Sequence, residues 1–326
     1  MTSEGYRIGI DVGGTKIAYG LFDAAGTLVE KRRRATQNDA SQEAFADIVA
    51  AEVRSLMAAH GLAAAQMEGV ALCFPSSVDS ARGVVVFTPT IPALRNFDAR
   101  GVFAPRLPGM RLVVDNDTNA AALAEHRHGA GRGHDHMLFT TLGTGIGSGL
   151  ILGGRLYRGA FGGAGESGHM IIEPGETACF CGCGNPGCFM GMASGGCVAK
   201  RIRADAARGE AASIAALAGR PEDITAVTLK QAFDAGDAYA QRTVQRMGRY
   251  IGLYLFNCFC LLNCDCYILG GGLVHYGPAL LDIVRSTFTQ YSASMRAPDD
   301  GIVILPAQTG DDMGIIGAAE LLRCES

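Results

Sequence analysis

Hydrophobic and polar positions along the chain predict strands and helices in alternation. Short apolar or alternating runs predict strands at residues 6–10, 17–22, 27–33, 70–74, 112–114, 137–142, 150–152, 155–157, 267–269 and 301–305. Longer segments between them predict helices at residues 41–60, 120–128, 195–208, 214–218, 228–235, 238–262, 279–290 and 313–322. Strands that alternate with helices are typical of layered α/β proteins, so α/β is the expected fold class.

Two of the predicted strand pairs flank a glycine-rich turn. The turns Asp11-Val12-Gly13-Gly14-Thr15-Lys16 and 143–149 suggest an internal duplication into two similar lobes. The first turn joins two strands, so it is neither a Walker loop, which needs a helix after it, nor a G-x-G-x-x-G dinucleotide motif. Its backbone N–H groups and the Thr15 hydroxyl could hold phosphate, and Asp11 could hold Mg²⁺ through water. The alternative is an ordinary glycine turn.

Asp117 lies between the predicted strand 112–114 and the predicted helix 120–128. Asp and Asn are preferred helix N-caps, which is the structural interpretation. In the functional interpretation, the helix dipole keeps the carboxylate ionised, and the carboxylate accepts a proton from a substrate hydroxyl.

Three cysteines and a histidine suggest a metal site. Cys181, Cys183 and Cys188, with His169 upstream, supply three thiolates and one imidazole, a set that suits a closed tetrahedral zinc site. The glycines between the cysteines allow the chain to fold tightly enough to bring the sulfurs together. Free core thiols are the alternative, and Cys179 could compete as a ligand.

Glu166 and His169 are three residues apart. If zinc binds one ring nitrogen of His169, the other nitrogen becomes an oriented donor. Next to the Glu166 carboxylate, that donor would suit the hydroxyls of a sugar. In the alternative, the outer nitrogen only bonds a backbone carbonyl.

Two further groups resemble metal sites but have simpler interpretations. Cys258, Cys260, Cys264 and Cys266 lie where a helix runs into a buried strand, and cysteine there behaves as a small hydrophobe. The sequence 134–136, His-Asp-His, is expected to be a solvated loop.

Composition and charge limit the classes of protein to which this chain can belong. The chain has 326 residues, 48% of them hydrophobic and 18% charged, with a net charge of −4. These values indicate a globular protein of one large or two medium domains, with no nucleic-acid or membrane partner. The only cationic run, residues 31–34, is expected to be a solvated strand end. The apolar stretch 250–262 is too short to span a bilayer, no secretory signal is recognised, and eleven cysteines favour the reducing cytoplasm.

Taken together, these motifs resemble the ROK family of bacterial sugar kinases and sugar-responsive repressors. The matching segments are residues 9–16, 116–117, 142–149, 164–169, 181–188 and 268–272, in family order. The combination of Glu-x-Gly-His with Cys-x-Cys-Gly-x-x-Gly-Cys is the most specific of these matches.

The resemblance implies an actin-like, ribonuclease-H-like ATPase fold with two lobes and a central cleft. The small lobe would contain residues 1–117 and 309–326. The large lobe would contain residues 118–308, with the zinc-binding segment 169–188. A homodimer is the family expectation.

The resemblance also implies transfer of the γ-phosphoryl of ATP to a hexose hydroxyl, usually O6, with Mg²⁺ and structural Zn²⁺. Asp117 would be the general base. The implied sugar ligands are Asn116, Asp117, Glu166 and His169, and the implied ATP and Mg²⁺ ligands are Asp11, Gly13, Gly14, Thr15, Lys16, Gly143, Thr144, Gly145, Gly271 and Gly272. Phosphoryl transfer needs mainly positioning and charge neutralisation, which such residues supply.

The chain departs from the family pattern at three positions of the implied sugar site. Met190 replaces a glutamate that follows the last cysteine, Ser76 replaces the glycine after Pro75, and Thr90 replaces an asparagine. The loop after Phe74-Pro75, which lacks its glycine, and the spacing of Cys183-Gly-Asn-Pro-Gly-Cys188 resemble bacterial D-allose kinases, although those keep the glutamate that Met190 replaces. The resemblance therefore implies D-allose, or a related aldohexose such as glucose, as the substrate.

Two other functions compete with the kinase. A non-catalytic sugar-sensing protein of the family is one, but a repressor is expected to carry a DNA-binding domain before Asp11, and Asp117 is retained. A nicotinamide enzyme is the other, and the absence of a predicted helix directly after residues 143–149 counts against it.

Overall fold

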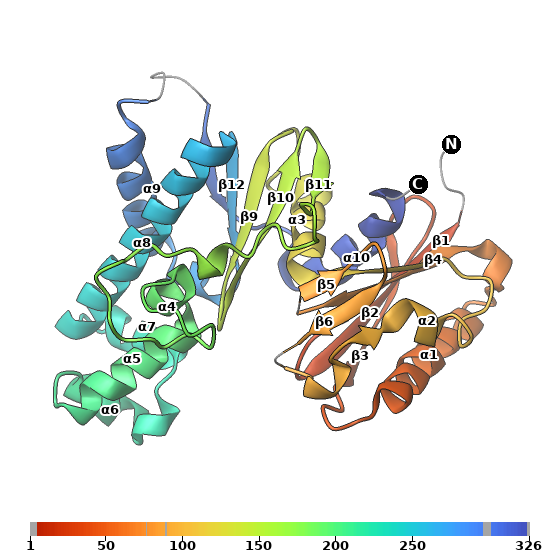
Figure 1. The fold of residues 1–326 in the computed structure, drawn as a ribbon, viewed down its shortest axis with the longest axis horizontal. Coiled ribbons are helices and arrows are strands. Elements are labelled where there is room, and N and C mark those ends of the chain that lie inside the picture. Colours follow the sequence, from red (N-terminus) through yellow and green to blue (C-terminus); the bar gives the residue numbers. More distant parts are fainter. Residues whose placement is uncertain (1–4, 76, 89, 296–300, 325–326) are drawn as a thin grey trace. The chain divides into compact units, whose positions relative to one another are not determined.

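Figure 1 shows the computed structural model, which describes residues 5–75, 77–88, 90–295 and 301–324. The chain forms two compact units. The first comprises Met1–Asp135, Gly149–Ala164 and Gln308–Ser326, and the second comprises His136–Ser148 and Gly165–Ala307. These units divide the chain differently from the predicted lobes, because residues 118–135 and 149–164 belong to the first unit. The lobe boundaries stay a prediction.

The first unit is built on a sheet with the strand order β3-β2-β1-β4-β8. These strands are β1 (Tyr6–Val12), β2 (Lys16–Phe22), β3 (Leu28–Ala35), β4 (Met67–Phe74) and β8 (Leu112–Asn116). A smaller sheet contains β5 (Ser77–Asp79), β6 (Val84–Phe87) and β7 (Phe97–Asp98). The helices of this unit are α1 (Gln42–Ala59), α2 (Ala99–Phe103), α3 (Asp117–His128) and α10 (Met313–Cys324).

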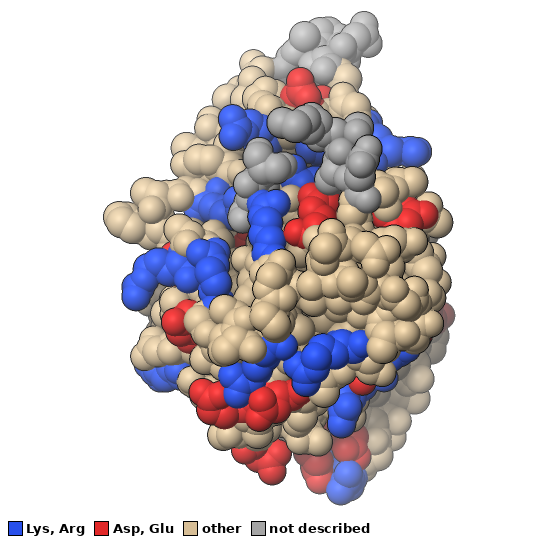
Figure 2. All heavy atoms as spheres, turned by 90° about the vertical axis from the view of Figure 1, so that its right-hand side faces the viewer, with Lys and Arg blue, Asp and Glu red and all other residues tan. Residues whose placement is uncertain are grey.

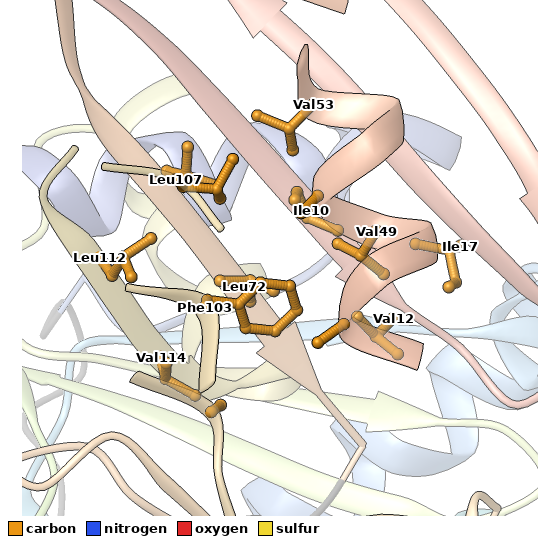
Figure 3. Packing of buried hydrophobic residues seen from close by; sticks show 14 of the residues in the cluster. Ile10, Val12, Ile17, Val49, Val53, Leu72, Phe103, Leu107, Leu112 and Val114 are labelled. Carbon is orange, nitrogen blue, oxygen red and sulfur yellow. The ribbon is translucent and has the colours of Figure 1, made fainter. Parts of the chain in front are cut away.

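Helix α1 forms one wall of the hydrophobic core of this unit. Its apolar positions, among them Val49 and Val53, recur on one helix face and are buried. They belong to the same buried cluster as Ile10 of β1 and Leu72 of β4, and both strands are almost continuously buried (Figure 3). A fully buried aliphatic side chain contributes about 1.5–3 kcal/mol of transfer free energy, so this cluster holds the helix on the sheet.

The parallel strands of this sheet end with polar residues in register. Strand β1 is parallel to β4, which is parallel to β8, and Asp11 pairs with Cys73, which pairs with Asp115. Carboxyl ends of parallel strands lie at one edge of a sheet, where ligands commonly bind. The register therefore brings Asp11 near the turn that follows β8.

The second unit contains β9 (Met137–Leu142), β12 (Cys266–Gly270) and β13 (Val303–Pro306) in a sheet of order β11-β10-β9-β12-β13. Strand β10 (Ile146–Leu152) begins in this unit and ends in the first, where β11 (Arg155–Tyr157) pairs with it. The helices are α4 (Phe189–Ala193), α5 (Gly195–Ala207), α6 (Ala212–Ala218), α7 (Ala226–Asp234), α8 (Ala238–Leu262) and α9 (Pro278–Ser292). Short 3₁₀ helices include Ser167–His169 and Gly272–Tyr276.

The predicted α/β class and most predicted elements are confirmed. The prediction missed the small sheet β5-β6-β7, whose strands are short and partly exposed, and it missed α2 and α4. Cys258, Cys264 and Cys266 are buried and Cys260 is exposed, and the group does not converge as metal ligands among the described residues. All eleven cysteines lie within the described ranges, and all are free thiols.

The cationic run forms β3 and is balanced by acids of the same unit. Lys31 forms an ion pair with Asp312, while Arg32 and Arg34 lie 3.1 and 3.6 Å from the carboxylate of Glu52. Figure 2 shows basic and acidic groups interspersed on the face that it presents. This arrangement agrees with a solvated strand rather than a nucleic-acid patch. Among the described residues, no helix has the length and apolar character needed to cross a bilayer.

Candidate functional site

The first glycine turn is a tight hairpin between β1 and β2. The Gly13 amide donates to the Lys16 carbonyl at 2.9 Å, and the Thr36 hydroxyl donates to the Gly13 carbonyl at 2.7 Å. The Gly13 amide is therefore already used within the turn. A Cβ on Gly14 would lie 2.7 Å from Cβ of Thr90, so this position needs glycine. Thr15 and Lys16 are exposed at the tip.

Asp11 lies next to this turn, at the end of β1. Its carboxyl group lies against Gly314 in the first turn of α10, where an added Cβ would come within 2.5 Å of it. Burial raises the pKa of Asp11, and the nearby Lys16 ammonium lowers it in part. A half-buried carboxylate beside a glycine turn is a group that could hold a hydrated cation.

Asn116, not Asp117, is the N-cap of α3. Its backbone is extended, and its side-chain oxygen accepts from the amides of Thr118 and Asn119 at 2.7 and 3.2 Å. The structural interpretation of Asp117 as the cap is therefore wrong. Asp117 is the first helical residue, and its Oδ1 accepts a hydrogen bond from the Thr118 hydroxyl at 3.2 Å.

The Asp117 carboxyl group has a strongly shifted acidity. Burial and, secondarily, the negative charge of Asp11 raise the pKa of Asp117 to about 7. A carboxylate with a pKa near neutrality takes up a proton more readily than an ordinary aspartate does, which is the property that a general base requires. Strongly shifted groups of this kind concentrate at functional sites.

The residue before this pair, Asp115, fixes the turn, and the sequence analysis missed it. The side chain is buried, and its Oδ2 accepts from Nε and Nη2 of Arg158 at 2.7 Å each. Its Oδ1 accepts from the Asn116 amide at 2.7 Å and from Nδ2 of Asn119 at 2.8 Å. An ionisable residue at the end of a buried strand was the available signal. Its partner Arg158 is 43 residues away in sequence and gave no signal.

The second glycine turn lies in the second unit. The Gly143 amide donates to the Gly145 carbonyl at 2.9 Å. The first amides of α5, from Gly195 and Gly196, donate to the carbonyls of Gly143 and Thr144 at 2.8 and 3.1 Å. The start of α5 thus holds this turn in place through two backbone hydrogen bonds.

Gly271 lies directly beside this turn. Strand β12 is parallel to β9, so both strands end at the same edge of the sheet. Gly271 has φ +84°, and a Cβ there would lie 2.6 Å from the Leu142 carbonyl oxygen. Only glycine combines this conformation with so close an approach. The structure therefore places Gly271 beside Leu142, the residue that precedes the Gly143–Gly145 turn.

The three cysteines and His169 converge. Their potential ligand atoms all lie within 4.8 Å of one another. Sγ of Cys183 and Sγ of Cys188 are 3.7 Å apart, and Sγ of Cys181 lies 3.9 Å from Nδ1 of His169. Thiolates around tetrahedral zinc are separated by roughly 3.8 Å, so both the donor set and its spacing fit that metal. The Cys179 thiol instead donates to the Cys181 carbonyl.

The two ring nitrogens of His169 face different groups. Nδ1 faces the thiols, and Nε2 lies 3.9 Å from a carboxylate oxygen of Glu166. The 3₁₀ helix Ser167–His169 follows Glu166 and sets this separation. An acceptor and an oriented donor therefore lie side by side, which is an arrangement suited to adjacent hydroxyls.

Met190 lies beside both the cysteine group and the Glu166–His169 turn. Its Cε is 3.8 Å from the place of a Cβ on Gly145 and 3.0 Å from that on Gly168. It also packs against the buried cluster of Cys181, Cys188 and Cys197. An apolar thioether therefore lies next to the Glu166–His169 turn.

Comparison with known proteins identifies the family of this chain. The family model described as "ROK family" matches residues 7–325, and the chain belongs to that family. The glucokinase of Streptomyces coelicolor is 33% identical over 98% of this chain and 98% of that protein. The xylose repressor of Bacillus subtilis is 27% identical over 98% of this chain and 77% of that protein.

Solved structures agree with this assignment. The ROK hexokinase from Thermus thermophilus has a TM-score of 0.81 at 32% identity and covers 96% of each chain. The ROK family glucokinase from Streptomyces griseus, in complex with glucose and AMPPNP, has a TM-score of 0.77 at 33% identity and covers 98% of this chain and 99% of that chain. The predicted family, the actin-like ATPase fold and the enzyme class, a sugar kinase, are confirmed.

Proposed function

We propose that the protein is an ATP-dependent hexose kinase with Asp117 as its general base. The observation that carries this proposal is a carboxyl group with a pKa of about 7 at the start of α3, in a member of a sugar-kinase family. In the proposed reaction, the sugar O6 attacks the γ-phosphorus while its proton passes to the Asp117 carboxylate. The bond between the γ-phosphorus and the bridging oxygen breaks, and ADP leaves.

The glycine-rich turns are proposed to supply the nucleotide ligands. The proposed phosphate ligands are Gly13, Gly14, Thr15, Lys16, Gly143, Thr144 and Gly145, and the proposed nucleoside ligands are Gly271 and Gly272. Asp11 would hold Mg²⁺ through water, and the metal supplies neutralisation of phosphate charge. The binding of AMPPNP by the Streptomyces griseus relative supports this proposal.

The sugar ligands are proposed to be Asn116, Glu166 and His169, together with Asp117. D-allose or a related aldohexose such as glucose is the proposed substrate, and the glucose bound to the Streptomyces griseus relative supports an aldohexose. His169, Cys181, Cys183 and Cys188 are proposed to hold one structural Zn²⁺, which leaves Nε2 of His169 free to face the sugar.

A panel of sugars tests the proposed function. Purified protein is expected to release ADP from Mg-ATP with at least one aldohexose, measured by a coupled assay. Allose, glucose, mannose, fructose and the N-acetylhexosamines form the panel. No ADP release with any of them would contradict the kinase proposal. That result would favour the alternative, a non-catalytic sugar-sensing protein, since a repressor is among the similar proteins.

Met190→Glu is expected to raise kcat/KM for the preferred aldohexose about tenfold, because a carboxylate at this position can accept a charge-assisted hydrogen bond from a hydroxyl. Met190 lies against Gly168, within the Glu166–His169 turn. Steady-state kinetics over the panel measures the change.

Two control variants separate charge from packing. Met190→Gln keeps the length of the side chain and should give a smaller gain, and Met190→Leu should give none. An equal gain in all three variants, or none with glutamate, would contradict a sugar contact at this position.

A further inference from the structure

Four hydroxyl groups meet in the interior of the second unit. Oη of Tyr254 lies 2.8 Å from Oγ of Ser148, 3.0 Å from Oγ of Ser167 and 3.3 Å from Oγ1 of Thr140. Oγ of Ser148 in turn lies 2.6 Å from Ser167 and 3.1 Å from Thr140. Tyr254, Ser148 and Thr140 are buried, and Ser167 is half-buried. These four side chains are called the hydroxyl cluster.

The hydroxyl cluster joins the two parts of the candidate site in this unit. Thr140 lies on β9 before the Gly143–Gly145 turn, and Ser148 lies on β10 after it. Ser167 directly follows Glu166 in the turn that ends at His169. Ser148 is also held through its backbone, because its amide donates to the Gly165 carbonyl at 3.0 Å. Tyr254, from α8, contacts all three others, as Ser148 does, and is the only member of the cluster that comes from a helix outside the two turns.

The ring of Tyr254 is fixed independently of its hydroxyl. It stacks on Phe189 with centroids 4.3 Å apart and an interplanar angle of 21°. Phe189 follows Cys188, and its amide donates to the Met170 carbonyl at 2.8 Å. Burial raises the pKa of Tyr254 above its usual value, so the hydroxyl keeps its proton. A phenylalanine could therefore keep the stack and lose only the hydrogen bonds.

We propose that Tyr254 is a positioning residue for the sugar. Through Ser148 and Ser167, it holds the turn that carries Glu166 and His169 at a fixed place relative to the Gly143–Gly145 turn. This inference rests on the proposed role of Glu166 and His169 as sugar ligands. Tyr254 acts through Ser167 and has no contact of its own with the substrate. Buried hydroxyl networks are cooperative, so the loss of one member loosens the others.

Tyr267→Phe supplies a matched control for Tyr254→Phe. Tyr267 lies on β12, is also fully buried, and its hydroxyl has no hydrogen-bond partner among the described residues. Both substitutions remove one buried phenolic hydroxyl from the same unit. Only Tyr254→Phe removes hydrogen bonds to the turn that carries Glu166 and His169.

Steady-state kinetics with the preferred panel sugar tests the proposal. Tyr254→Phe is expected to raise KM for the sugar about tenfold, while KM for ATP stays within about twofold of the wild type. Tyr267→Phe is expected to match the wild type in both constants. A merely structural role of Tyr254 would lower the amount of active enzyme and leave both KM values unchanged.

Ser167→Ala keeps the proposal testable if Tyr254→Phe does not fold. It is expected to show the same selective rise in the KM for the sugar. The double variant Tyr254→Phe/Ser167→Ala is expected to have a KM for the sugar no higher than that of the poorer single variant, because both substitutions break the same linkage between Tyr254 and Ser167. Equal KM values for the sugar in Tyr254→Phe and Tyr267→Phe, or fully additive effects in the double variant, would overturn this inference and leave the proposed function standing. A wild-type protein inactive on the whole panel would overturn the proposed function and the inference with it.

Discussion

Asp117→Asn is expected to lower kcat for sugar phosphorylation by about 10²–10⁴-fold, the range that a general base contributes. The asparagine keeps the size of the side chain and cannot take the proton from the sugar hydroxyl. The Asn116 cap and the Asp115–Arg158 pair hold the turn without the Asp117 carboxylate, so the helix start should persist. Coupled release of ADP measures kcat.

Folding and charge are controlled separately in this experiment. Asp311→Asn removes an exposed carboxylate from the same unit and should leave kcat unchanged. The folded pKa of Asp117 lies above its ordinary value, so its ionisation opposes folding as pH rises through about 7. Asp117→Asn should therefore be at least as stable as the wild type at pH 8. An unfolded variant at that pH, or one with full activity, would contradict the role of Asp117.

The same carboxylate sets an expected pH dependence. Since the base acts when deprotonated, kcat/KM should fall toward tenfold per pH unit below the pKa of about 7 and level off above it. Burial is the larger cause of this shift and the Asp11 charge the second, so Asp11→Asn should move the midpoint toward lower pH. That shift can be followed in any residual activity of the variant.

The parts of the site that depend on short-range pattern were readable from the sequence. The glycine turns, the Asn116-Asp117 pair and the Cys181–Cys188 spacing each lie within a few residues, and local chemistry limits what they can form. The N-cap of α3 could not be predicted from short-range pattern. Asn116 and Asp117 are both good caps, and the choice between them depends on Asp115, which fixes the Asn116 amide.

Long-range partners could not be predicted from pattern. Buried Glu125 on α3 accepts from the amides of Ala130, Gln308 and Thr309 at 2.8–3.1 Å, and Gln308 is where the chain re-enters the first unit. Nothing in the composition near Glu125 indicates partners some 183 residues away. Tyr254 is a similar case, because a tyrosine in an apolar helix gives no sign of the three hydroxyls that it meets. Such contacts follow from how the layers pack, after the local elements have formed.

Cys183→Ser is expected to remove zinc and to lower the free energy of unfolding by more than the roughly 0.5–3 kcal/mol of an ordinary substitution. Zinc binding is coupled to folding, because the unfolded chain does not hold the four ligands together and the free energy of metal binding therefore adds to that of folding. The segment around Cys183 has little other support, since Cys183 and residues 184–186 are exposed. Metal analysis should find about one zinc per wild-type chain, and thermal unfolding measures the loss.

Cys179→Ser tests whether the Cys179 thiol is a zinc ligand. The Cys179 thiol only donates to the Cys181 carbonyl, at 3.2 Å, so this variant should keep its zinc and most of its stability. Equal loss of metal in both variants would make Cys179 a ligand, and a wild-type chain without zinc would remove the metal site. Because Nδ1 of His169 faces the thiols and Nε2 faces Glu166, zinc loss should also raise the KM for the sugar. Zinc loss that destabilised the protein but left this KM unchanged would confine the metal to a structural role.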